Sequence, residues 1–186
     1  SSLDHQTLTP PVRLYTRFCR AVIRLIGWKL AGEQPANAKY IMVGAPHTSN
    51  WDGIYMLFVR AALDIKIKFI AKDSLFRWPL GGLMRRVGGI PVNRRERNNF
   101  TQQMVNYFHT QEELVLLVAP EGTRGKTKRW KSGFYYIALG AGVPILMAYI
   151  DYAHKQIGLE QVLVPSGDIQ ADFEKIRAYY APFKGK

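Results

Sequence analysis

Short apolar runs along the chain alternate with segments whose apolar residues recur at helical spacing. Continuous apolar runs are typical of strands that are buried on both faces of a sheet, and their alternation with helices predicts an α/β fold. The predicted strands are Tyr40–Gly44, Ile67–Ala71, Ile90–Val92, Leu114–Val118, Val143–Ile150 and Val162–Val164. The predicted helices are Ile54–Leu63, Asn98–Thr110, Phe134–Leu139 and Asp168–Tyr180, and the pattern of Leu75–Val87 is mixed.

The longest uncharged run, Ser132 to Ile150, approaches the length of a membrane-spanning helix. Gly140, Gly142 and Pro144 interrupt it near its middle. Such a cluster ends a helix, so we expect a helix, a turn and a buried strand instead of a membrane span.

The N-terminal segment has a different pattern. After Pro11, arginines recur at spacings of four, three and four residues, which places them on one stripe of a helix. Apolar and aromatic residues occupy much of the remaining surface. Such a helix could lie in a membrane interface, or it could pack on the domain with its arginines in water. We expect a disordered leader over 1–10, an amphipathic helix over 11–30 and a single domain over 31–186. The arginines are Arg13, Arg17, Arg20 and Arg24.

Composition adds a constraint on partners. Hydrophobic residues make up 47% of the 186 residues, as in a folded globular chain, and 26 Lys and Arg against 14 Asp and Glu give a net charge of +12. This charge suggests an anionic partner, such as nucleic acid, an anionic membrane or a phosphorylated substrate. The single cysteine, Cys19, excludes an internal disulfide and a Cys-rich metal site.

The first candidate site follows the strand Tyr40–Gly44. His47 lies just beyond its carboxyl end, where α/β sheets form sites, and could act as a general base. Asp52 could orient its ring. Residues five apart on a helix point about 140° apart, so the two can meet only if His47 lies in the turn before the helix. Alternatively, His47 is a loop histidine, and Ser49 and Asp52 form a capping box.

The second candidate follows the strand Leu114–Val118. Backbone amides of the glycine-containing turn at Glu121 and Gly122 could face an anion, and the guanidinium of Arg124 suits a phosphate. Lys131 belongs to the basic residues that extend the positive field. The alternative is a solvated basic loop in which Glu121 is a local counter-ion.

A third and weaker candidate is Arg94, which with Arg95 ends the segment after the strand Ile90–Val92. On its own, this block is better explained as a solvated basic surface. The chain has no Gly-x-Ser-x-Gly nucleophile motif and no His-Glu-x-x-His zinc motif. If His47 is a base, we therefore expect it to activate a substrate group and not an enzyme serine.

Taken together, these blocks resemble the glycerolipid acyltransferase family, whose bacterial members include the 1-acylglycerol-3-phosphate acyltransferases. The resemblance covers roughly residues 28 to 165 and rests on four blocks in order. Pro46, Ala119 and Met147 depart from the usual family pattern. The blocks are His47 to Asp52, Gly89 to Arg94, Glu121 to Arg124, and Val143 to Ile145.

The resemblance implies an α/β sandwich around a mixed, mainly parallel sheet, with an acyltransferase domain over 31–186. It implies that His47 deprotonates the hydroxyl of a lysophospholipid and that Asp52 orients His47. The acyl donor would be a thioester of coenzyme A or of acyl carrier protein, with no metal and no bound cofactor. The acceptor would be bound by Arg94, Glu121, Gly122, Thr123 and Arg124, with Lys131 as a further phosphate contact.

The resemblance also implies membrane association at the cytoplasmic face, peripheral or monotopic, on an anionic surface. The expected acceptor is 1-acylglycerol-3-phosphate, giving phosphatidic acid. One alternative is another lysolipid, such as a lyso-amino-lipid or lysophosphatidylglycerol. A second is a basic nucleic-acid-binding domain, for which the chain shows no known signature, so no nucleic-acid partner is expected.

Overall fold

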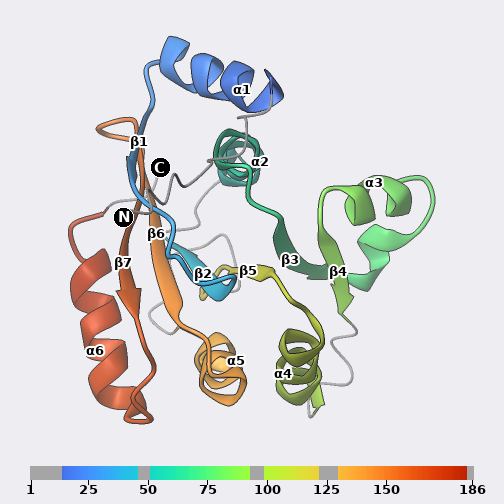
Figure 1. Cartoon of the computed structure of the whole chain (residues 1–186), viewed down its shortest axis with the longest axis vertical. Coiled ribbons are helices and arrows are strands. Elements are labelled where there is room, and N and C mark those ends of the chain that lie inside the picture. Colours follow the sequence, from blue (N-terminus) through green and yellow to red (C-terminus); the bar gives the residue numbers. More distant parts are fainter. Residues whose placement is uncertain (1–13, 46–50, 93–98, 122–129, 184–186) are drawn as a thin grey trace, which may run out of the picture.

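Seven strands form one mixed sheet in the computed structural model, which describes residues 14–45, 51–92, 99–121 and 130–183 (Figure 1). Their order is β1-β7-β6-β2-β5-β3-β4. The five strands from β6 to β4 in this order run parallel, β7 is antiparallel to β6, and β1 is parallel to β7. The expected mixed, mainly parallel sheet is confirmed. The strands are β1 (Lys29–Gly32), β2 (Lys39–Ala45), β3 (Ile67–Lys72), β4 (Gly89–Val92), β5 (Leu114–Val118), β6 (Ile145–Asp151) and β7 (Gln156–Leu163).

Helices cover both faces of this sheet (Figure 1). The chain moves one way across the sheet from β2 through β3 to β4, and then back through β5 to β6. Right-handed crossovers therefore place α2 and α3 on one face and α4 and α5 on the other. Arg60 of α2 donates a 2.5 Å hydrogen bond to the carbonyl of Val87, the residue directly after α3. This bond ties α2 to α3. The helices are α1 (Leu14–Leu25), α2 (Trp51–Leu63), η1 (Asp73–Phe76), α3 (Gly81–Arg86), α4 (Phe100–Thr110), α5 (Gly133–Ala141) and α6 (Ile169–Tyr180).

The central strands are buried on both faces, as their unbroken apolar runs predict. Along β2, Ile41 and Val43 belong to the core under α4, α5 and α6, whereas Tyr40 and Met42 belong to the core on the other face. Because alternate side chains of a strand point to opposite faces, a strand with helices on both sides needs apolar residues throughout.

The sequence pattern did not predict the strand β1, and it predicted only the last part of β7. The strand β1 is only four residues long and is partly exposed, so its residues carry no clear strand pattern. It forms because it pairs with β7, which is itself longer than the predicted Val162–Val164. The amphipathic segment expected over 11–30 is a helix only to Leu25 within the described residues, and β1 begins at Lys29. The leader expected over 1–10 lies outside the described residues.

The uncharged run from Ser132 folds as expected. The helix α5 ends at Gly142, whose φ of 66° lies in the left-handed region that glycine adopts readily, and β6 begins at Ile145. In the part of the chain that the structure describes, no helix is both long and apolar enough to cross a bilayer.

The N-terminal helix α1 divides into three sectors. Thr16 and Ile23 are buried, and α1 packs along α2. Phe18 and Leu25 are 66% and 84% exposed, so the helix also turns an apolar sector to solvent. The exposed arginines lie between these two sectors. A helix that merely packs on the domain would not need this second apolar sector.

Candidate active site

The two main candidate segments leave neighbouring parallel strands at the same edge of the sheet. Val43 of β2 pairs with Val118, the last residue of β5. His47 follows Val43 by four residues, and Glu121 follows Val118 by three. Adjacent strands lie about 4.8 Å apart, so both segments begin side by side.

The connections from these two strands pass to opposite faces of the sheet. The strand β2 leads to α2 on one face, and β5 leads to α5 on the other (Figure 1). In α/β proteins, sites form beyond the carboxyl ends of strands where neighbouring connections diverge in this way. The topology thus places the His47 and Glu121 segments where such a site is expected.

The helix α2 meets the spacing condition for His47 and Asp52. It begins at Trp51, so His47 precedes the helix and Asp52 is its second residue. His47 lies outside the described residues, as does Ser49, and the structure describes only the backbone of Asp52. The proposed contact between the two side chains therefore stays a prediction.

The segment after β5 has a buried acid at its start. Glu121 is only 9% exposed, although it follows a strand end and precedes a basic stretch. A counter-ion on a solvated loop would remain in water, so this burial favours a role inside a site. Gly122, Thr123 and Arg124 lie outside the described residues.

Two contacts hold the chain on either side of that stretch. The amide of Lys131 donates a 2.8 Å hydrogen bond to the carbonyl of Pro120. The ring of Trp130 packs edge-on against Tyr180, with ring centroids 5.2 Å apart. The described residues on the two sides of the stretch that carries Arg124 therefore lie close together beside β5, where the side chain of Lys131 is exposed.

Tyr180 is a buried residue beside the candidate site that the sequence analysis did not single out. Its buried hydroxyl lies 2.8 Å from the carbonyl oxygen of Val43 and 2.9 Å from that of Ala148. Burial is the main cause that raises the pKa of Tyr180 well above its ordinary value, and the charge of Glu121 adds to the rise. Tyr180 thus links the end of α6 to β2, β6 and the neighbourhood of Glu121. A tyrosine near the end of a helix carries no sequence signal for such a role.

The strand that leads to Arg94 lies farther from β2 than the strand that leads to Arg124. Arg94 follows β4, the edge strand, which β3 and β5 separate from β2. Three strand spacings correspond to about 14 Å. Arg94 itself lies outside the described residues. Its segment shares the carboxyl edge because β4 is parallel to β3 and β3 is parallel to β5.

A second histidine–carboxylate pair lies at the turn between β6 and β7. His154 Nδ1 is 2.7 Å from Asp151 Oδ2. Burial alone would raise the pKa of Asp151, but hydrogen bonds from His154 and from the Ala153 amide outweigh it and lower that pKa. The His154 side chain is largely exposed. It is a surface histidine and provides a control for His47.

Metal binding receives no support from the side chains described. Among the described residues, no group of three His, Cys, Asp or Glu side chains could hold a metal ion. His47 is not among them, so the expectation of a metal-free and cofactor-free site stays a prediction.

Comparisons with known proteins identify the family and the fold. A family model described as Acyltransferase matches residues 29–151, more than half of the chain. The 1-acyl-sn-glycerol-3-phosphate acyltransferase of Haemophilus influenzae is 26% identical over 160 residues, which are 81% of this chain and 65% of that protein. The chain thus spans less than two thirds of that relative. The crystal structure of the LPA acyltransferase PlsC from Thermotoga maritima matches with a TM-score of 0.58 at 20% identity, over 90% of this chain and 74% of that one. This structural likeness shows that the two chains share a fold, and it shows no more than that.

Proposed function

Since the chain belongs to the Acyltransferase family, we propose that it is an O-acyltransferase that moves a fatty acyl group from a thioester to a lysophospholipid hydroxyl. We take 1-acylglycerol-3-phosphate as the acceptor and phosphatidic acid as the product, on the name of the Haemophilus influenzae relative. The observation that carries the proposal is the pairing of Val43 with Val118, from which the His47 and Glu121 segments leave the sheet together.

The proposed chemistry is a direct transfer. His47 takes the proton of the acceptor hydroxyl, and the resulting alkoxide attacks the thioester carbonyl to form a new C–O bond. The tetrahedral intermediate then collapses, the C–S bond breaks, and the thiolate takes the proton from the imidazolium of His47. Asp52 holds the ring of His47 in the required tautomer and stabilises its cation.

Backbone amides would stabilise the negative charge of the intermediate. The first turn of α2 has amides without partners inside the helix, and Asp52 lies in that turn. The turn at Glu121 and Gly122 is a second source of donors. Both would lie at the carboxyl edge, where β2 leads to the segment of His47.

The acceptor phosphate would bind mainly to Arg124. The segment of Arg124 leaves β5, one strand from β2, whereas Arg94 starts three strands away and would reach in from the side. We assign Glu121 to the glycerol end and to the orientation of Arg124, because a carboxylate facing a phosphate would repel it. Thr123 and Lys131 would complete the phosphate contacts.

The helix α1 would hold the domain at the membrane. Its exposed apolar sector, which contains Leu14, Phe18 and Leu25, would enter the interface, and its arginines would contact lipid phosphates. We place the chain peripherally or monotopically on the cytoplasmic face, because the net charge of +12 suits an anionic surface. The acyl donor is either acyl-coenzyme A or an acyl carrier protein thioester.

Thiol release from an acyl thioester tests this function. We expect release that requires lysophosphatidic acid and that His47→Ala lowers by at least about 10³-fold. His154→Ala, which removes the histidine of the exposed pair, should retain full activity. Release that does not depend on His47 would overturn the mechanism. A preference for lysophosphatidylglycerol would keep the mechanism and change the acceptor. Salt-sensitive RNA or DNA binding without any release would favour the nucleic-acid alternative.

A further inference from the structure

The connection between β3 and β4 exposes an unusual set of apolar side chains. Trp78 is 94% exposed, and Leu75, Leu80 and Leu83 are also largely in water. All four lie within residues 73–87, a stretch that contains one acid, Asp73. We call this set, together with the exposed arginines Arg77, Arg85 and Arg86, the Trp78 surface.

This connection is held in place, so its exposed residues are not simply part of a loose loop. Phe76 is buried, and its ring lies so close to Gly89 that a Cβ there would come within 2.8 Å of it. A Cβ on Gly81 would come within 2.0 Å of the Phe76 carbonyl oxygen. At the far end, Arg60 binds the carbonyl of Val87. Phe76 therefore fastens the connection to the domain while its apolar neighbours point outward.

The Trp78 surface lies at the same edge of the sheet as the candidate site. The helix η1 starts at Asp73, directly after the carboxyl end of β3. That strand is parallel to β5, whose carboxyl end leads to Glu121. The exposed apolar side chains of this connection thus begin where the site segments leave the sheet.

The C-terminal end of the helix α1 reaches the same edge, whereas its N-terminal half crosses to the end of α2, where Tyr15 donates to Asp64 and Arg20 donates to the carbonyl of Ala62. The strand β1 begins at Lys29, which pairs with Gln156, and Gln156 pairs with Asp151 at the carboxyl end of β6. Because α1 directly precedes β1, it joins the sheet at the carboxyl edge (Figure 1). The strand β2, which leads to His47, is the fourth of the seven, between β1 and β4 at the two ends of the sheet.

We propose that the Trp78 surface is a second membrane-contact site, at which Trp78, Leu80 and Leu83 enter the interface of an anionic bilayer. Three arginines against one acid give it the positive charge that anionic headgroups attract. Tryptophan and leucine flanked by arginine suit the boundary between headgroups and acyl chains. In combination with the exposed Leu25 at the C-terminal end of α1, this contact would hold the carboxyl edge against the lipid surface, a consequence that rests on the proposed function.

The shape of the surface favours lipid over an acidic protein such as an acyl carrier protein. Aromatic anchors at protein interfaces are buried in well-packed pockets of the partner. Trp78 stands almost entirely free of its own domain, so it would need a deep and matching pocket in a protein partner. A bilayer deforms around such a side chain and needs no matching pocket.

Vesicle binding by the full chain, without any acyl thioester, tests this proposal independently of catalysis. We expect Trp78→Ala to weaken binding to phosphatidylglycerol-containing vesicles roughly tenfold, since a large apolar side chain loses its burial. Val164→Ala is the matched control, because Val164 is 75% exposed and follows β7 at the opposite edge of the sheet. It should bind as the unchanged chain does.

Two further measurements identify the lipid contact itself. Brominated lipids should quench a part of the tryptophan emission that is lost in Trp78→Phe. Arg77→Gln combined with Arg86→Gln should weaken binding to anionic vesicles and leave the weaker binding to phosphatidylcholine vesicles unchanged.

Unchanged vesicle binding by Trp78→Ala would overturn the proposal, as would an equal loss in Val164→Ala. Loss of affinity for an acyl carrier protein with vesicle binding intact would overturn it too and assign the surface to a protein donor. A normal melting temperature of Trp78→Ala would exclude misfolding as the cause of a binding loss. If the enzyme assay fails but Trp78→Ala still weakens binding, the proposed function falls and the membrane contact stands.

Discussion

The hydroxyl of Tyr180 lies 2.8 Å from the carbonyl oxygen of Val43, although 137 residues separate them in the chain. Val43 is two residues before the end of β2, and the same hydroxyl also contacts the carbonyl of Ala148 on β6. The end of α6 thus fixes the strand that leads to His47. It also supports Trp130, which ends the stretch containing Arg124.

Removal of this hydroxyl should affect catalysis more than folding. Tyr180→Phe keeps the ring that packs on Trp130 but removes the single O–H donor that lies between two buried carbonyls, at a cost of about 1–2 kcal/mol of unfolding free energy. We expect kcat to fall severalfold with little change in KM, measured by thiol release. Tyr179→Phe is the control, because its hydroxyl makes only a 3.4 Å contact with Met147. Equal effects of the two substitutions on kcat would refute a positioning role for Tyr180.

Substitution of Arg124 should weaken binding of the acceptor without weakening binding of the thioester donor. Arg124→Ala should raise KM for lysophosphatidic acid about 10- to 100-fold, because charge-assisted hydrogen bonds to phosphate are lost, and leave KM for the thioester nearly unchanged. Lys66→Ala removes a positive charge just before β3, at the opposite edge of the sheet, and should change neither value. An equal rise in both KM values for Arg124→Ala would move this residue away from the phosphate.

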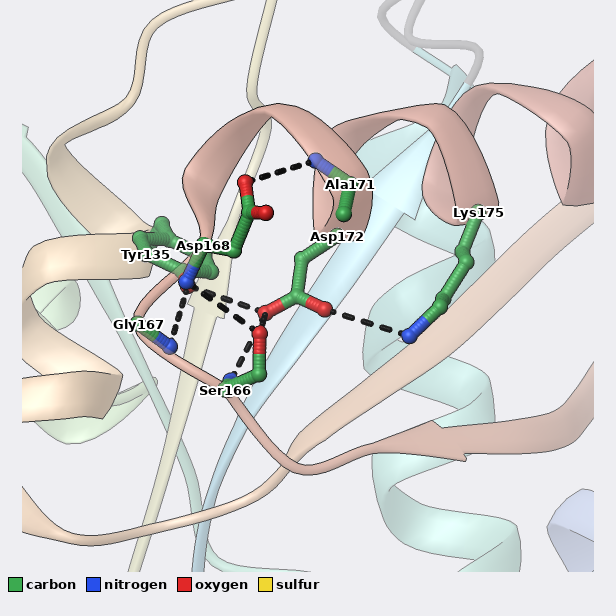
Figure 2. Close-up of polar contacts among 7 residues, drawn as sticks. All are labelled: Tyr135, Ser166, Gly167, Asp168, Ala171, Asp172 and Lys175. Carbon is green, nitrogen blue, oxygen red and sulfur yellow. Dashed lines mark hydrogen bonds and ion pairs between the residues drawn. The ribbon is translucent and has the colours of Figure 1, made fainter.

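A buried carboxylate at the start of α6 should make stability depend on pH. Asp172 accepts hydrogen bonds from Tyr135, from the amide and hydroxyl of Ser166, and from Lys175 (Figure 2). Burial alone would raise the pKa of Asp172, but these hydrogen bonds outweigh it and lower the pKa below the ordinary value of 3.8. The stabilisation is therefore fully present above about pH 4 and is lost as the pH falls through the lowered pKa.

Asp172→Asn tests this assignment. We expect a loss of about 2–3 kcal/mol of unfolding free energy at pH 7, because the amide cannot accept all these hydrogen bonds. The loss should shrink below pH 4, where the carboxylate of the unchanged chain is itself neutralised. Urea unfolding at several pH values measures both effects. Asp168→Asn is the control, since asparagine also caps a helix, here by accepting from Ala171. An Asp172→Asn loss that is independent of pH would contradict the assignment.

Tyr40 should tolerate loss of its hydroxyl. Its ring is buried in the core under α2, and within the described residues its hydroxyl has no hydrogen-bond partner. Burial raises its pKa to about 12. An unpartnered buried hydroxyl is unfavourable, so Tyr40→Phe should stabilise the fold by about 1 kcal/mol, measured by thermal unfolding. A clear destabilisation would show that the hydroxyl has a partner.

The apolar sector of α1 should contribute to membrane binding without contributing to stability. Phe18→Ser should weaken vesicle binding about tenfold while the melting temperature stays unchanged, because Phe18 makes little contact with the domain. Ile23→Ser, on the buried sector, should instead lower the melting temperature. A stability loss in Phe18→Ser comparable to that in Ile23→Ser would favour the alternative of a helix that only packs on the domain.

The fold class and the order of the main elements can be predicted from the sequence, because they depend on local hydrophobic patterns. The run Leu114–Val118 coincides with β5, and the glycines after Leu139 end α5 as predicted. The four motif blocks also placed the chain in its family, which the match over residues 29–151 confirms.

Which distant segments meet depends on how the strands and helices pack, and no local pattern predicts it. The pairing of β5 with β2 and β3 brings Glu121 beside the segment of His47, and no local pattern encodes that order of strands. The short strand β1 forms because β7 offers a partner, and Tyr180 acquires its position because α6 crosses to β2. Burial of Glu121 and exposure of Trp78 are likewise properties of the packed molecule, since each depends on what the rest of the chain covers.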